Sequence, residues 1–194
     1  MKTSVVFDDF DGENEDSAWR VDFAGRAEAP DLDGEGGVAC WAQWCYRVTA
    51  LADIECCPGE WTHMSIGVPD EEPYTSVESL IEQSMTVSEN DADYTKKFRS
   101  SGGPLMMRGA EWNNEGDHLL EEGESAVFCF TAPDSPVSAA PIGMKVGSIR
   151  LFDTIAGPGK HSCPVGAPTT TPWGAGLLIL TLFSIRLAET LHRR

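Results

Sequence analysis

Stretches in which apolar and polar residues alternate recur along this chain of 194 residues. CYRVTAL alternates from Tyr46 to Ala50, WTHMSIGV does so over residues 61–68, and GESAVFCFT does so from Ala126 to Phe130. A period of two is typical of strands that bury one face, and glycine and proline turns separate these stretches. The pattern predicts an all-β fold, an antiparallel β-sandwich of the jelly-roll or immunoglobulin-like kind.

Two segments of the body depart from this alternation. VESLIEQSM (77–85) is the best helical candidate, with Thr75 or Ser76 as a side-chain cap, although its partial alternation also allows a strand. ENDADYTKKFRSSGGP (89–104) is rich in charged and turn-forming residues and predicts a polar loop. Short apolar runs near the start, SVVF and AWRVDF, are typical of further short strands.

Composition divides the chain into three expected parts. Residues 1–156 form the acidic β-sandwich domain, and the Gly-, Pro- and Thr-rich residues 157–172 form a linker. Residues 173–194 contain an apolar run followed by Arg186 and two terminal arginines, which predicts a C-terminal hydrophobic helix. The 19 residues from Trp173 to Leu191 approach the length of a membrane span. An amphipathic helix packed on the domain is the alternative.

The formal net charge of −17 limits the classes of partner. Such a charge repels nucleic acid phosphates, so we expect no binding to DNA or RNA. The tail 173–194 is the segment expected to contact a membrane, with its terminal arginines on the cytoplasmic side.

Six cysteines bear on the compartment in which the protein folds. Disulfides are the favoured interpretation, because the pairs and histidines of a zinc site are not evident in the sequence, and they place the domain outside the cytosol. Buried free thiols and a metal site remain the alternatives. The candidate disulfide cysteines are Cys40, Cys45, Cys56, Cys57, Cys129 and Cys163.

No catalytic residue is predicted. The sequence contains neither the zinc-binding motif H-E-x-x-H nor the serine-nucleophile motif G-x-S-x-G. No spacing supports a catalytic carboxylate pair in the acidic N-terminal region. We therefore expect a protein that is not an enzyme.

The five-residue motif D-x-D-G-E occurs twice, 22 residues apart, and calcium is the one cofactor that it would fit. Neither copy completes an EF-hand loop, so plain solvated turns are the alternative. The candidate calcium ligands are Asp9, Asp11, Glu13, Asp31, Asp33 and Glu35.

The C-terminal segment resembles the bacterial IPTL-CTERM sorting signals. Pro168-Thr169, three intervening residues and Trp173-Gly174 precede the apolar run, as in the pattern I-P-T-L-S-E-W-G. CYRVTAL, WTHMSIGVP, GESAVFCFTAP and MKVGSIRLFDTIAGPG are similar to the strands of secreted bacterial choice-of-anchor domains. The resemblance transfers no catalytic site, and it implies a sorting protease as a partner.

Together these features predict an exported protein anchored by its C-terminus, at the cell surface or on the outer-membrane side. Its role would be structural, in adhesion or in matrix assembly, with a protein or glycan partner that the sequence does not identify. A calcium-binding surface module is one alternative. The other is a tail-anchored membrane protein with its domain in the cytosol. This alternative is supported by MKTSVVFDDFDGENED, which lacks the apolar core of a signal peptide, and it is opposed by the cysteines.

Overall fold

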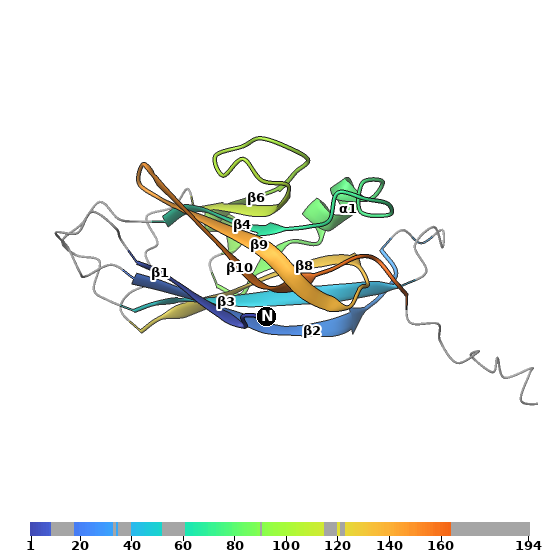
Figure 1. Ribbon diagram of the computed structural model, residues 1–194, viewed down its shortest axis with the longest axis horizontal. Helices are drawn as coiled ribbons and strands as arrows, with labels where there is room; N and C mark the ends of the chain where they lie inside the picture. Colours follow the sequence, from blue (N-terminus) through green and yellow to red (C-terminus); the bar gives the residue numbers. More distant parts are fainter. Residues whose placement is uncertain are drawn as a thin grey trace, which may run out of the picture. The chain divides into compact units, whose positions relative to one another are not determined.

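The computed structural model describes residues 1–8, 18–32, 34, 40–51, 61–89, 91–114, 120 and 123–163. This part of the protein is all-β, with two five-stranded sheets of antiparallel neighbours (Figure 1). Sheet A contains, in spatial order, β1 (Ser4–Asp8), β2 (Ala18–Ala29), β3 (Trp41–Ala50), β8 (Ser125–Pro133) and β5 (Thr86–Val87). Sheet B contains β10 (Ile149–Pro158), β9 (Val137–Val146), β4 (Trp61–Gly67), β7 (Gly109–Asn114) and β6 (Tyr94–Arg99). Helix α1 (Glu78–Gln83) and the 3-10 helix η1 (Asp91–Asp93) lie between β4 and β6 in the chain.

The alternation that predicted strands is confirmed in β3 and β8. Tyr46 lies opposite Phe128 and Val48 opposite Ala126 in the register of the two strands, and all four side chains are buried. Cys45 and its neighbours at the odd positions of this pair face the other side of the sheet, where burial is lower. The period of two therefore assigns one face of sheet A to the core.

Aromatic rings join the two sheets around Phe128 of β8. Its ring centroid lies 5.6 Å from that of Trp61, 5.3 Å from that of Tyr94 and 5.7 Å from that of Trp112, all three of which belong to sheet B. Each pair meets edge to face, the arrangement that aromatic quadrupoles favour. Since one buried cluster draws on both sheets, the fold is sandwich-like, as Figure 1 shows in the two layers of strands.

Short contacts cover both edge strands of sheet B, β10 and β6. On one side the carbonyl of Lys2, just before β1, accepts a hydrogen bond of 2.8 Å from the amide of Ala156 in β10. On the other side Glu82 of α1 accepts a 2.8 Å bond from the amide of Phe98 in the edge strand β6. A paired edge amide is not available to another chain, so both contacts protect the sandwich from edge-to-edge association.

The predicted helix at 77–85 is confirmed as α1, but its predicted side-chain cap is wrong. Val77 occupies the N-cap position, and no side chain caps the helix there. The Ser76 hydroxyl donates instead to the carbonyl of Pro73, and the Thr75 hydroxyl donates to Glu72. Both hydroxyls therefore stabilise the preceding turn.

The polar loop predicted at 89–104 is wrong for residues 94–99, because β6 pairs along its whole length with β7, whereas residues 100–104 are bends and turns. The adjacent charged residues Lys96 and Lys97 interrupt the apolar–polar alternation by which a strand is recognised in the sequence. Lysines are common on edge strands, because their charge discourages pairing with another chain. Tyr94 supplies the apolar anchor, since its ring is buried and stacks on Trp61 at 5.8 Å.

The predicted start of the linker at residue 157 is wrong, because residues 157 and 158 still belong to strand β10. Gly157 and Pro158 belong to β10 and pair with β9, and the compact unit extends to Cys163. A Cβ at position 157 would lie 2.6 Å from Cβ of Ala140 and 2.8 Å from the hydroxyl of Tyr46. Close packing, rather than linker flexibility, therefore requires the glycine.

The expected C-terminal helix and most of the linker lie outside the described residues. Within the part of the chain that the structure describes, no helix has the length and apolar character needed to cross a membrane.

Replacing Phe128 with alanine tests the inter-sheet core. We expect the free energy of unfolding to fall by about 3–5 kcal/mol, because the substitution leaves a cavity among Trp61, Tyr94 and Trp112. Urea denaturation followed by tryptophan fluorescence measures the change. The control is Val6→Thr, at a side chain that is 49% exposed, and we expect it to change stability by less than about 0.5 kcal/mol. Equal effects of the two substitutions would contradict the assignment of the core.

Candidate functional site

Polar side chains gather around Asp134, at the end of the sandwich where β8 finishes. The Asp134 carboxylate is almost fully buried, and its Oδ1 accepts hydrogen bonds from the amide of Ser135 at 2.8 Å and from Nε of Arg26 at 2.8 Å. Nη2 of Arg26 also contacts Oδ1. This hydrogen bonding raises the pKa of Arg26, whose guanidinium also lies 5.8 Å from the ring centroid of Trp44. The charge pair therefore fixes the residue that follows β8 against β2.

The backbone of Asp134 ties the start of β3 to the chain beyond β10. Its amide donates to the carbonyl of Cys40 at 3.0 Å, and its carbonyl accepts a 2.8 Å hydrogen bond from Nδ1 of His161. Next to it, the Ser135 hydroxyl accepts a 3.1 Å bond from the amide of Gly159. Residues 159–163 are thus held by side-chain and backbone contacts after the last strand has ended.

Tyr74 completes this arrangement from the segment before α1. Its hydroxyl lies 2.9 Å from the carbonyl of Gly159 and 3.2 Å from that of Pro133, and its ring meets the imidazole of His161 edge to face. Burial raises the pKa of Tyr74 to about 12, so the hydroxyl keeps the proton that it donates. We call this cluster the Asp134 junction; its members are Arg26, Cys40, Tyr74, Asp134, Ser135, Gly159, His161 and Cys163.

Four of the six candidate cysteines form disulfides, which confirms the prediction for these four. Cys40 is bonded to Cys163 across 123 residues of chain, with their Cα atoms 5.7 Å apart. Cys45 of β3 is bonded to Cys129, the residue directly opposite in β8. Cys56 and Cys57 lie outside the described residues. Two disulfides are typical of a protein that folds in an oxidising compartment.

The Asp134 junction contains a serine, a histidine and an aspartate, the residue types of a hydrolytic triad. The hydrogen bonds that link these residues in a triad are not formed here. The hydroxyl of Ser135 is engaged with Gly159, and only 2% of the residue is exposed. The Asp134 carboxylate binds Arg26 rather than an imidazole, and His161 directs Nε2 toward Cys163. These three side chains therefore do not form a nucleophile–base pair.

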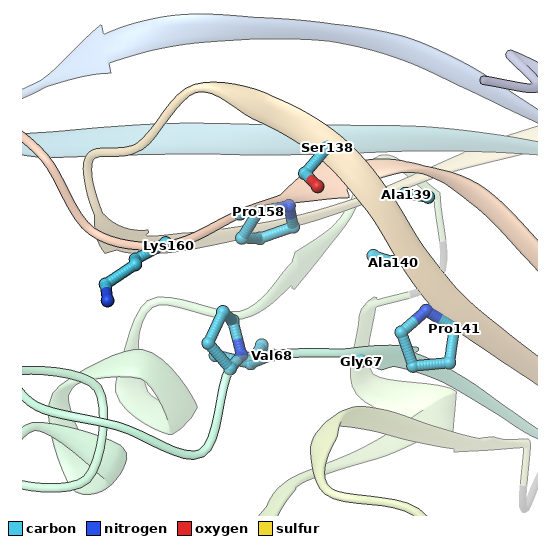
Figure 2. A pocket seen from close by; sticks show the side chains of 10 residues that line it. Gly67, Val68, Ser138, Ala139, Ala140, Pro141, Pro158 and Lys160 are labelled. Carbon is cyan, nitrogen blue, oxygen red and sulfur yellow. The ribbon is translucent and has the colours of Figure 1, made fainter.

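A shallow groove of about 380 Å³ lies beside the junction, over the ends of β4, β9 and β10 (Figure 2). Most of its lining side chains are small and apolar, and Ser138 and Lys160 supply its polar side chains. Gly67 allows β4 to approach β9 here, because a Cβ at this position would lie 2.3 Å from Cγ of Pro141. The lining residues are Gly67, Val68, Pro69, Ser138, Ala139, Ala140, Pro141, Pro158, Gly159 and Lys160.

Most residues of the predicted calcium and sorting sites lie outside the described part of the chain. Asp31 is described, and its Oδ1 accepts a 3.0 Å hydrogen bond from the indole of Trp41. This carboxylate thus has a packing role at the start of β3, and calcium binding stays a prediction. The residues outside are Asp9, Asp11, Glu13, Asp33 and Glu35 of the acidic turns, and Pro168, Thr169, Trp173 and Gly174 of the sorting motif.

His161 is the functional candidate that sequence reasoning missed. The sequence shows it two residues before Cys163, but Cys40 is 123 residues away from that cysteine and reaches it only in the fold. The H-x-C spacing was the one local signal, and it becomes informative only together with the disulfide.

A double-mutant cycle on Arg26 and Asp134 tests the junction. We expect Asp134→Ala to lower the free energy of unfolding by about 2 kcal/mol, less than for a fully buried pair because Arg26 is partly exposed. In that background Arg26→Met should cost at least about 1 kcal/mol less than in the wild type. The pair Arg20–Asp22, which is more exposed than Arg26–Asp134, serves as the control, with a coupling expected below about 1 kcal/mol. Additive effects at Arg26 and Asp134, measured by urea denaturation, would contradict the junction.

Comparisons with protein-family models, with curated proteins and with solved structures find no match. The geometry that bears on function is therefore that of the Asp134 junction, its disulfide and the adjacent groove.

Proposed function

We propose that this protein is exported and anchored to the cell surface by its C-terminal segment, with a non-enzymatic structural role in adhesion or matrix assembly. Its body is a β-sandwich of jelly-roll or immunoglobulin-like type, in which β3–β8 and β4–β9 pair strands far apart in the chain. The observation that carries the proposal is the disulfide between Cys40 and Cys163, because it secures the domain just before the segment that resembles a sorting signal.

The position of this disulfide suits a domain that is held from its C-terminal side. β10 lies at the edge of sheet B, and among the described strands its ladder partner is β9, so tension applied beyond residue 163 would otherwise peel β10 away one residue pair at a time. The bond from Cys163 to Cys40 passes the tension to the start of β3 instead. This strand pairs on both sides, with β2 and with β8.

The disulfides and the acidic composition support export independently of the tail. Two disulfides form and persist outside reducing compartments. A formal net charge of −17 favours solubility and disfavours adsorption to nucleic acids or to anionic lipid surfaces. These properties fit a domain that projects from a cell surface.

Surface anchoring is tested in the native host with the full chain and a Trp173→Ala variant. We expect protease added to intact cells to cleave the wild-type domain, and the variant to be lost from the surface fraction. Thr170→Ala is the matched control, because position 170 departs from the sorting pattern, and it should leave anchoring unchanged. A domain that is protected in intact cells, with all six thiols free, would overturn the proposal in favour of a cytosolic tail-anchored protein.

The transfer of tension through the Cys40–Cys163 bond is tested by pulling the domain from both ends in single-molecule force measurements. In the Cys40→Ser/Cys163→Ser variant we expect the extension on unfolding to increase by about 130 Å, because the remaining Cys45–Cys129 bond keeps 84 of the 123 residues closed and the other 39 become extensible. We also expect this variant to unfold at lower force. Cys45→Ser/Cys129→Ser is the control, since its loop lies within the segment that Cys40–Cys163 closes, and the extension should not change. An unchanged unfolding force in the first variant would show that β10 does not need the bond.

A further inference from the structure

Three potential metal ligands meet at the C-terminal side of the Asp134 junction. One ligand atom from each of Cys40, His161 and Cys163 lies within 4.8 Å of the other two. Each of these residues is partly exposed, so a small reductant or a metal ion can reach them. In the structure the sulfurs of Cys40 and Cys163 are bonded to each other.

His161 is oriented as a metal ligand would be. Its Nδ1 donates a hydrogen bond of 2.8 Å to the carbonyl of Asp134, so a neutral imidazole carries its lone pair on Nε2. Nε2 lies 3.7 Å from Sγ of Cys163. Histidines that bind metal commonly donate their second ring N–H to a carbonyl, which fixes the tautomer and the ring orientation.

The distance between nitrogen and sulfur also fits zinc. Zinc binds a thiolate sulfur at about 2.3 Å and an imidazole nitrogen at about 2.0–2.1 Å, which in a tetrahedron separates the bound sulfur and nitrogen by roughly 3.6 Å. The observed distance of 3.7 Å is close to this value. Two bound sulfurs would lie roughly 3.8 Å apart, so only the sulfurs of the disulfide have to separate.

We propose that Cys40, His161 and Cys163 bind a zinc ion when their disulfide is reduced. A dithiol reductant transfers two electrons and two protons to the Cys40–Cys163 bond and itself becomes a disulfide. The two thiols lose two protons as zinc binds, and Nε2 of His161 supplies the third ligand. Water occupies the fourth position.

This site would keep the C-terminal side of the domain tied to the start of β3 in both redox states. The disulfide makes the connection in an oxidising compartment, and zinc makes it wherever the thiols are reduced, as before export. Arg26 supports both forms indirectly, because it holds Asp134, whose carbonyl orients His161. The proposal does not depend on surface anchoring, since it concerns three side chains within the compact unit.

The test uses the full wild-type chain, reduced with a phosphine under anaerobic conditions and treated with iodoacetamide with or without one equivalent of zinc. Peptide mass spectrometry then gives the alkylation rate of each cysteine. We expect zinc to slow alkylation of Cys40 and Cys163 at least tenfold while Cys45 and Cys129 react at unchanged rates. Absence of protection, or protection confined to Cys56 and Cys57, would overturn the proposal.

A substitution separates zinc binding by this site from binding by the two thiols alone. Cobalt titration of the reduced chain should produce the visible bands of tetrahedral thiolate coordination, and zinc should displace them. We expect His161→Gln to weaken cobalt binding at least tenfold, whereas the control His63→Gln should leave it unchanged. Equal affinity in wild type and His161→Gln would show that the imidazole only packs against the disulfide, and would overturn the three-ligand site.

Discussion

Edge-to-face packing of aromatic rings between the sheets is the interaction on which the rest of the structure depends. Phe128 brings the central strand β8 of sheet A against Trp61, Tyr94 and Trp112 of sheet B. Because these rings come from β4, β6 and β7, one side chain fixes the position of most of the second sheet. The contacts of Lys2 with β10 and of Glu82 with β6 then cover the two edge strands of sheet B.

The Asp134 junction uses a different kind of interaction at the end of the same sandwich. Hydrogen bonds and an ion pair, rather than apolar burial, hold residues 159–163 where no strand pairing is left to do so. The carboxylate of Asp134 is buried and paired with the guanidinium of Arg26. The ion pair offsets the cost of removing this carboxylate from water. The disulfide at Cys163 and the orientation of His161 both depend on this polar framework.

Strands could be predicted from the sequence where one face is buried and the other is exposed, as in β3 and β8. The sequence did not allow β6 to be predicted, because an edge strand carrying Lys96 and Lys97 looks like a loop until its partner β7 is known. The presence of disulfides followed from the cysteine count, but their partners did not, since the contact of Cys40 with Cys163 is set by the whole fold. For the same reason His161 had no visible ligand partner in the sequence.

The Cys45–Cys129 disulfide has a consequence for how the sandwich is assembled. It joins two residues that lie directly opposite each other on neighbouring strands. A slip of one residue between β3 and β8 would turn Tyr46 or Phe128 toward the solvent. Once the bond has formed, such a slip is incompatible with the covalent structure, so oxidation makes the correct alignment of the two central strands permanent.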